Sequence, residues 1–80
     1  MYYTYVLYSV EYDRIYIGQS DDLISRLERH NKGIVKSTKG FKPWKMIYHE
    51  KFQNRREAMK REKELKSHKR TRLDSRKIIE

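Results

Sequence analysis

The pattern of hydrophobic and polar positions predicts two strands at the start of the chain. Tyr2–Ser9 is rich in aromatic and β-branched side chains and contains neither Gly nor Pro, which favours a strand. The polar residues Glu11–Asp13 predict a turn, and Arg14–Ile17 predicts a second strand that pairs with the first as a hairpin. Because side chains alternate between the faces of a sheet, Tyr5 and Tyr16 would share one face. Two ordinary half-buried strand tyrosines would give the same pattern.

A helix is predicted directly after the second strand. Gly18 allows the backbone to turn sharply, and Ser20 can cap a helix over residues 21–31 through its hydroxyl. The apolar residues of this helix fall on one stripe that should lie on the sheet: Leu23, Ile24 and Leu27. Arg26 and His30 stand four residues apart at the border of that stripe. Two polar side chains are therefore expected near the end of the second strand.

A third strand and a second helix are predicted in the second half of the chain. Lys45–Phe52 has strand composition, and Asn54 with a Glu three residues later is a capping-box pattern, so the helix begins at about Arg55. Its apolar positions are Ala58, Met59 and Leu65. Glu62 falls in the middle of that apolar stripe, where a carboxylate is costly to bury unless it is paired, hydrogen-bonded or bound to a metal. An ion pair with Arg26 or another cation, which would only tie helix to helix, explains this position as well as a metal site or another functional role does.

These elements predict an α+β fold in which a three-stranded antiparallel sheet is flanked by helices, in the order β-β-α-β-α-α. Leu73, Ile78 and Ile79 indicate a short third helix or a continuation of the second. Eighty residues leave room for one thin core, so we expect a single domain over residues 1–80. The chain has no Cys, and no apolar run approaches the ~20 residues of a membrane helix. We expect a cytoplasmic protein without a membrane partner.

Composition adds a strong positive charge, because 20 Lys and Arg stand against 11 Asp and Glu for a net charge of +9. An excess of this size favours nucleic acid as a partner over a merely solvated surface. Lysines recur between the first helix and the third strand, among hydroxyls and aromatic rings that suit phosphates and bases. Trp44 and Phe41 can instead anchor this segment on the core. The candidate nucleic-acid-binding residues are Lys32, Lys36, Lys39, Lys42, Arg70 and Arg72.

The remaining polar candidates together suit phosphodiester hydrolysis, which must activate a water molecule and neutralise charge that grows on the phosphate. Arg26 offers a planar, permanently charged fork for two phosphate oxygens. Glu62 suits a divalent cation such as Mg²⁺, which needs only one or two carboxylates when phosphate and water complete its shell. Tyr5, Tyr16 and His30 remain for positioning and proton transfer.

Five positions at matching spacing across 58 residues resemble the GIY-YIG nuclease superfamily: Tyr5, Tyr16 within Tyr16-Ile17-Gly18, Arg26, His30 and Glu62. The order of the predicted elements is also similar to that family. The text from Pro43 to Lys66 resembles its small stand-alone bacterial members. Two positions depart from the pattern, because the first tripeptide reads Tyr3-Thr4-Tyr5 and Asp74 stands where many members carry Asn.

The resemblance implies a nuclease fold and one-metal hydrolysis, with Tyr5 as general base or water-positioning group, supported by Tyr16. It also implies that Arg26 stabilises the transition state, Glu62 holds the metal, and His30 is an auxiliary. We therefore expect an endonuclease that requires Mg²⁺ or Mn²⁺ and cleaves DNA with little sequence preference. Branched or damaged duplexes, and DNA repair or recombination, are the candidate contexts. The alternative is a noncatalytic nucleic-acid-binding module; a structural or interaction protein would leave Arg26 and Glu62 without a reason to converge.

Overall fold

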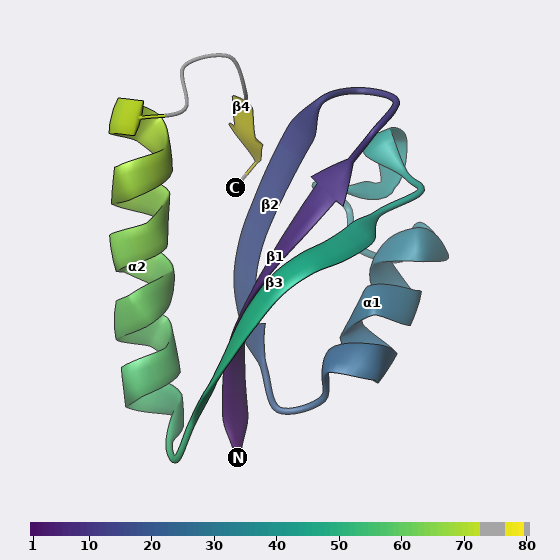
Figure 1. The fold of residues 1–80 in the computed structure, drawn as a ribbon. Coiled ribbons are helices and arrows are strands. Elements are labelled where there is room, and N and C mark those ends of the chain that lie inside the picture. Colours follow the sequence, from purple (N-terminus) through teal and green to yellow (C-terminus); the bar gives the residue numbers. More distant parts are fainter. Residues whose placement is uncertain (73–76, 80) are drawn as a thin grey trace.

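The computed structural model describes the backbone of residues 1–72 and 77–79 and the side chains of residues 1–67. Figure 1 shows two helices beside a twisted sheet. In chain order the elements are β1 (Tyr2–Ser9), β2 (Arg14–Ser20), α1 (Leu23–Asn31), a short 3₁₀ helix (Lys39–Phe41), β3 (Lys45–Phe52), α2 (Arg55–Arg72) and β4 (Lys77–Ile79). In the described part of the chain, no helix is long and apolar enough to cross a membrane.

The sheet has the strand order β3-β1-β2-β4. Strand β1 lies between two antiparallel partners, β2 and β3, which confirms the predicted α+β fold with a three-stranded antiparallel sheet. The prediction of a helix at Ile78 and Ile79 is wrong, because Lys77–Ile79 instead forms a parallel strand beside Arg14–Tyr16. Two consecutive β-branched residues fit this edge position, and the pairing satisfies backbone groups that β2 would otherwise leave unpaired. Leu73 and Asp74 lie outside the described residues.

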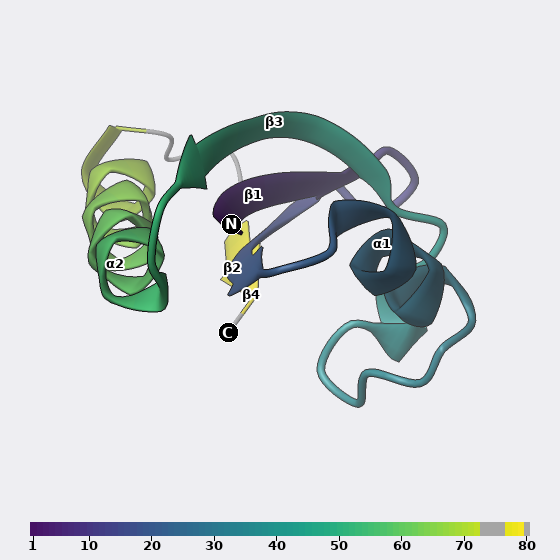
Figure 2. The same ribbon diagram turned by 90° about the horizontal axis from the view of Figure 1, so that it is seen from below.

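The two helices cover opposite faces of the sheet, as Figure 2 shows. On the α1 face, Tyr5, Leu7 and Trp44 form a buried cluster that is completed by residues of α1 and the following loop. On the α2 face, the buried cluster is Val6, Ile15 and Ile17, against which Leu65 packs. Alternation along β1 therefore divides one thin core into two, and it sends the tyrosine that was predicted to be functional toward α1.

Helix α1 begins later than the sequence predicts. Strand β2 continues through Gly18 to Ser20, so the chain does not turn at the glycine. Asp22 is the capping residue, and its carboxylate accepts a hydrogen bond of 3.1 Å from the Ser25 amide. The hydroxyl of Ser20, predicted as the cap, accepts from the Asp22 amide instead. Tertiary pairing with β1 therefore extends the strand past the residue at which local preference would end it.

Helix α2 begins where the capping pattern predicts, because Asn54 accepts a hydrogen bond from the Glu57 amide at 2.9 Å. The Thr4 hydroxyl donates to the Ala58 carbonyl at 2.6 Å, and Ala58 is fully buried against the sheet. This contact sets the rotation of the helix about its axis. Met59, one residue further and 45% exposed, turns away from the sheet, so its prediction as a core residue is wrong.

Candidate functional site

Tyr5 stands at the centre of the predicted site. Its side chain on β1 is 1% exposed, and its hydroxyl oxygen lies 3.1 Å from Nε2 of His30 on α1. The ring of Tyr16 on β2 lies 6.1 Å from that of Tyr5 and 4.7 Å from the His30 imidazole, measured between centroids. The hairpin register therefore places both tyrosines on one face, as predicted, and α1 adds the histidine to them.

Gly18 leaves the space that the Tyr5 hydroxyl occupies. Gly18 and Tyr5 are directly paired across the hairpin. A Cβ atom added to Gly18 would lie 2.8 Å from the Tyr5 hydroxyl oxygen and 2.9 Å from a ring carbon of Tyr16, which is too close for either pair of atoms. This glycine was predicted to give a turn; the structure shows that it gives room for the two tyrosine rings.

A chain of hydrogen bonds fixes the protonation of His30. Its Nδ1 lies 2.8 Å from the Thr38 hydroxyl oxygen, and that hydroxyl donates to the Val35 carbonyl at 3.3 Å. Because the Thr38 proton points to Val35, its oxygen accepts from His30 Nδ1–H. Nε2 of His30 then carries the lone pair and accepts the proton of the Tyr5 hydroxyl. This assignment satisfies all three contacts with one proton each, whereas the other tautomer satisfies only two.

Burial and nearby charges shift both titrating groups at this point. The pKa of Tyr5 is raised well above 10, chiefly by burial; Tyr16 and Glu62 raise it further, and Arg26 opposes them. Burial, Arg26 and Arg29 together lower the pKa of His30 from 6.5 to about 4. At neutral pH, Tyr5 is therefore protonated and His30 is neutral. Arg26 from α1 and Glu62 from α2 both act electrostatically on the Tyr5 hydroxyl, which links the five predicted residues.

The Arg26 guanidinium is half-buried and has no ion pair or side-chain hydrogen bond within the described residues. Glu62 is 21% exposed in its side chain and pairs with Lys66 on the same helix at 2.9 Å. Of the two cations that the sequence left open, the structure therefore pairs Glu62 with the other one, Lys66, rather than with Arg26, and this pair lies within α2 and does not tie the two helices together. An i,i+4 pair on a helix contributes only about 0.5 kcal/mol, so Lys66, itself partly exposed, can leave the carboxylate at little cost.

The donor set limits how a metal ion could bind. Across the described residues, no group of three or more His, Cys, Asp or Glu could hold an ion. The site fits a hard divalent cation only if Glu62 supplies one ligand and substrate phosphate and water supply the others. That arrangement is common for Mg²⁺, which keeps much of its water shell.

The predicted lysines lie on the segment that connects α1 to β3. Lys32, Lys36, Lys39 and Lys42 are all exposed. Trp44 is buried and anchors the segment, as the sequence allowed, because its indole N–H donates to the Thr38 carbonyl at 3.0 Å. The Asn31 side chain both donates to and accepts from the Trp44 backbone. Arg70 and Arg72 belong to the end of α2, and their side chains lie outside the described part.

Sequence reasoning missed Thr38, which is 0% exposed and orients the histidine. It lies in an aperiodic stretch where neither helical nor strand spacing marks a residue as buried. A buried histidine needs a partner for each ring nitrogen, so a search for hydroxyls within one turn or loop of His30 would have found it. Gly18 was marked for its backbone freedom, but its packing role depends on the hairpin register.

A hairpin carrying Tyr5 and Tyr16, followed by a helix with Arg26 and His30 and a second helix with Glu62, defines a small α+β domain. The sequence matches the GIY-YIG catalytic domain over residues 1–77, and the chain belongs to this family. Membership implies a nuclease-type function and a nucleic acid substrate.

Similar proteins are small bacterial ones. The chain is 42% identical over 66 residues to a UPF0213 protein of Pediococcus pentosaceus, covering 81% of this chain and 68% of that protein. It is 40% identical over 63 residues to a UPF0213 protein of Clostridium perfringens, covering 78% and 67%. A UPF0213 protein of Staphylococcus aureus is 38% identical over 55 residues, covering 68% and 67%. No solved structure matches the chain.

Proposed function

We propose that this protein is an endonuclease that hydrolyses phosphodiester bonds in DNA with little sequence specificity and requires Mg²⁺ or Mn²⁺. The observation that carries the proposal is the convergence of opposite charges on one buried hydroxyl. Arg26 and Glu62 come from helices on opposite faces of the sheet, yet both influence the pKa of Tyr5. Nothing in packing alone requires an unpaired guanidinium and a displaceable carboxylate at the same place.

In the proposed reaction, a water oxygen attacks phosphorus while the bond to the leaving oxygen breaks. Tyr5 takes a proton from that water as its own proton passes to Nε2 of His30, along the hydrogen bond already present. Nδ1–H of His30 stays bound to Thr38 and keeps the imidazole in place. Tyr5 passes a proton on without first ionising, so a pKa above the usual value does not prevent this proton relay.

Arg26 neutralises the charge that grows on the nonbridging phosphate oxygens, since its guanidinium has no ion pair with any side chain of residues 1–67. A phosphate beside Arg26 also offsets part of the positive charge that lowers the pKa of His30, so substrate binding makes His30 a better proton acceptor. Glu62 would hold a divalent cation, which when bound supplies charge stabilisation to the leaving oxygen. Tyr16 packs against the rings of Tyr5 and His30 and holds them in position relative to each other.

DNA without strong sequence preference is the proposed substrate because the described side chains provide charge and rings rather than a base-reading element. The exposed lysines Lys32, Lys36, Lys39 and Lys42 supply backbone contacts. Branched duplexes suit such shape and phosphate recognition, and they would connect the activity with repair or recombination.

One observation favours a second candidate, a noncatalytic nucleic-acid-binding module. Glu62 is engaged by Lys66, and among the residues that the structure describes it belongs to no group of three or more His, Cys, Asp or Glu that could hold a metal ion. Such a module would bind DNA with a steep dependence on salt and would cleave nothing in any divalent metal.

The test is cleavage of supercoiled, branched and single-stranded DNA in Mg²⁺ or Mn²⁺ by the wild type and two variants. Glu62→Gln removes one charge at constant shape and should lower the cleavage rate at least about a hundredfold, since even outer hydrogen-bond partners of metal ligands contribute about 10–100-fold. Arg26→Gln should have a loss of similar size. Glu11→Gln, at an exposed position of the β1–β2 turn, is the matched charge control.

Thermal unfolding of the same variants separates chemistry from folding. Glu62→Gln should melt within a few degrees of the wild type, because only a surface ion pair is lost. DNA binding with no cleavage by the wild type would instead establish the binding module. Cleavage equal in the wild type and in Glu62→Gln would remove Glu62 from the site.

A further inference from the structure

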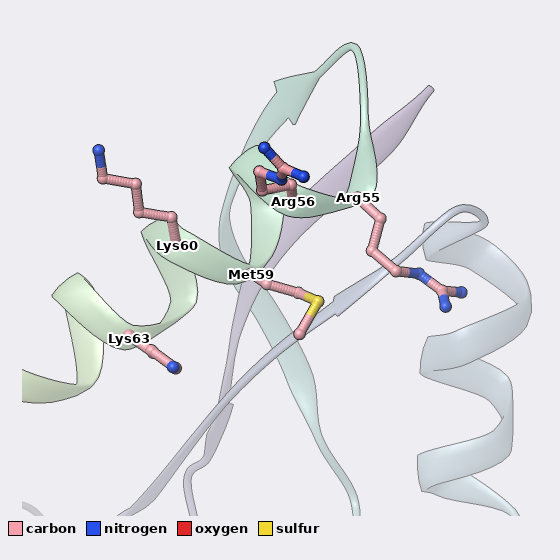
Figure 3. Close-up of a pocket in the computed structure, with 5 residues that line it drawn as sticks. All are labelled: Arg55, Arg56, Met59, Lys60 and Lys63. Carbon is pink, nitrogen blue, oxygen red and sulfur yellow. The ribbon is translucent and has the colours of Figure 1, made fainter.

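A second basic surface lies on α2, away from the lysine-rich segment. A hollow of about 520 Å³ is lined by Arg55, Arg56, Met59, Lys60 and Lys63. Figure 3 shows these five side chains projecting from the helix. Their spacing of one, four, five and eight residues from Arg55 places them on one side of an α-helix. We call Arg55, Arg56, Lys60 and Lys63 the basic stripe.

The cations of α2 differ in whether they form ion pairs, according to their position around the helix. Arg61 pairs with Glu50 at 3.0 Å and with Glu64 at 3.2 Å, and Lys66 pairs with Glu62. In contrast, no member of the basic stripe has an ion pair within the described residues. Lys60 also borders a second hollow that contains carboxylates, yet none of them lies within ion-pair distance. Four cations therefore lie together on one surface with no ion pair among the described residues, which favours an external anion.

The stripe has an apolar component as well. Met59 is 45% exposed between the cations, and the Arg55 guanidinium carbon lies 5.5 Å from the centre of the Tyr2 ring. The cation–π contact directs Arg55 along the surface toward the sheet. Exposed thioether and methylene groups beside cations suit a ligand that has apolar sugar faces as well as charged groups.

The length of the stripe indicates a polymer rather than a single phosphate. From Arg55 to Lys63 the helix rises about 12 Å, which equals the rise of about three to four nucleotides in one strand of a duplex. Glu62 follows Met59 by three residues, so it stands beside the stripe on the helix surface. A nucleic acid strand along the stripe would therefore pass the carboxylate of the catalytic site.

We propose that the basic stripe binds the phosphate backbone of the substrate strand that flanks the cleavage point. This inference rests on the proposed function for the identity of its ligand. The lysine-rich segment follows α1 and the stripe belongs to α2, so the two basic surfaces would hold the substrate from opposite faces of the sheet.

The experiment compares two double variants that each remove two lysine charges from exposed positions. Lys60→Gln with Lys63→Gln changes the stripe, and Lys45→Gln with Lys51→Gln changes β3, outside both basic surfaces. All proteins carry Glu62→Gln and are assayed without divalent metal, so binding is measured without cleavage. The readout is fluorescence anisotropy of a labelled duplex from 50 to 300 mM salt.

In the stripe variant, the negative slope of log affinity against log salt should become shallower by about 1.8, because each of the two lost phosphate contacts contributes about 0.9. The β3 variant should change it by less than half of that. Equal slopes for the two variants would overturn the proposal. An oligoglutamate peptide of equal charge that binds the Glu62→Gln protein more tightly than the duplex does, and loses that affinity in the stripe variant, would also overturn it in favour of an acidic protein partner.

The experiments distinguish a failure of the proposal that the stripe binds DNA from a failure of the proposal that the protein is a nuclease. If the wild type binds DNA through the stripe but cleaves nothing, the inference stands as part of a binding module. If Lys60→Gln with Lys63→Gln, made without Glu62→Gln and assayed with Mg²⁺, binds and cleaves like the wild type while Glu62→Gln is inactive, the nuclease stands and the stripe does not.

Discussion

The two halves of the site are held in place by different forces. On the α1 half, Tyr5, His30 and Thr38 are at most 1% exposed and joined by hydrogen bonds. On the α2 half, Glu62 is partly exposed and held only by a surface ion pair to Lys66. A buried polar group that loses its partner costs about 1–3 kcal/mol, whereas a surface pair contributes about 0–1 kcal/mol. In the proposed reaction, catalysis and stability would therefore depend on the same atoms on the α1 half and on different atoms on the α2 half.

The largest effect expected from this difference is on the pH dependence of stability. Because the pKa of His30 is 6.5 in the unfolded chain and about 4 in the folded protein, the unfolded chain binds a proton first as the pH falls. The stabilisation present above pH 6.5 is lost progressively down to about pH 4, a change of about 3 kcal/mol.

Urea unfolding of the wild type at a series of pH values between 7 and 4 measures this loss. His30→Gln removes the titration and should flatten the curve over that interval. Glu62→Gln should keep the wild-type curve, since its group lies on the other half. An unchanged free energy of unfolding in the wild type between pH 6.5 and pH 4 would contradict a buried neutral His30.

A smaller effect is expected at Gly18, where the α1 half has no spare volume. Gly18→Ala should lower the free energy of unfolding by about 2 kcal/mol, because the new methyl group must displace two packed tyrosine rings. Gly40→Ala is the matched control, since nothing lies within 4 Å of its Cβ position. Equal stability of the two variants, measured by denaturant titration, would show that the tyrosine rings shift freely.

The smallest of these effects is expected from Thr38→Val, which keeps the shape and removes the hydroxyl. We expect a loss of about 1 kcal/mol, because Nδ1–H of His30 then lacks an acceptor. The ring ¹⁵N chemical shifts should report an Nδ1-protonated imidazole in the wild type and a changed tautomer ratio in the variant. Thr38→Ser should restore the wild-type spectrum, and identical spectra in all three proteins would deny Thr38 its positioning role.

Features governed by local pattern were predictable from the sequence. The bounds of β1 and β3 follow from strand composition, and the start of α2 follows from the cap at Asn54. The shared face of Tyr5 and Tyr16 follows from alternation alone, because the hairpin register is set by a short turn. The resemblance then selected five residues: in the structure Tyr5, Tyr16 and His30 are in contact, and Arg26 and Glu62 act electrostatically on Tyr5.

Features that depend on contacts between distant segments were not predictable. On a helical wheel, Met59 and Glu62 both fall within the apolar stripe of α2. The Thr4–Ala58 hydrogen bond sets the rotation of the helix about its axis, and therefore how far each side chain points away from the sheet. The i,i+4 spacing allows Glu62 to pair with Lys66, but the sequence alone does not select that partner over Arg26 or a metal ion. Strand β4 depends on an edge of β2 that lies more than 60 residues away in sequence.

The anchoring of the lysine-rich segment has a consequence for how its length can vary. Asn31 holds the backbone of Trp44 at one end, and Thr38 is fixed to His30 in the middle. These side chains divide the segment into two short arcs, residues 32–37 and 39–43. Doubling the length of a flexible arc costs only about 0.6 kcal/mol in loop-closure entropy. Residues can therefore be inserted into either arc to extend its reach along a substrate while Tyr5 and His30 stay in register.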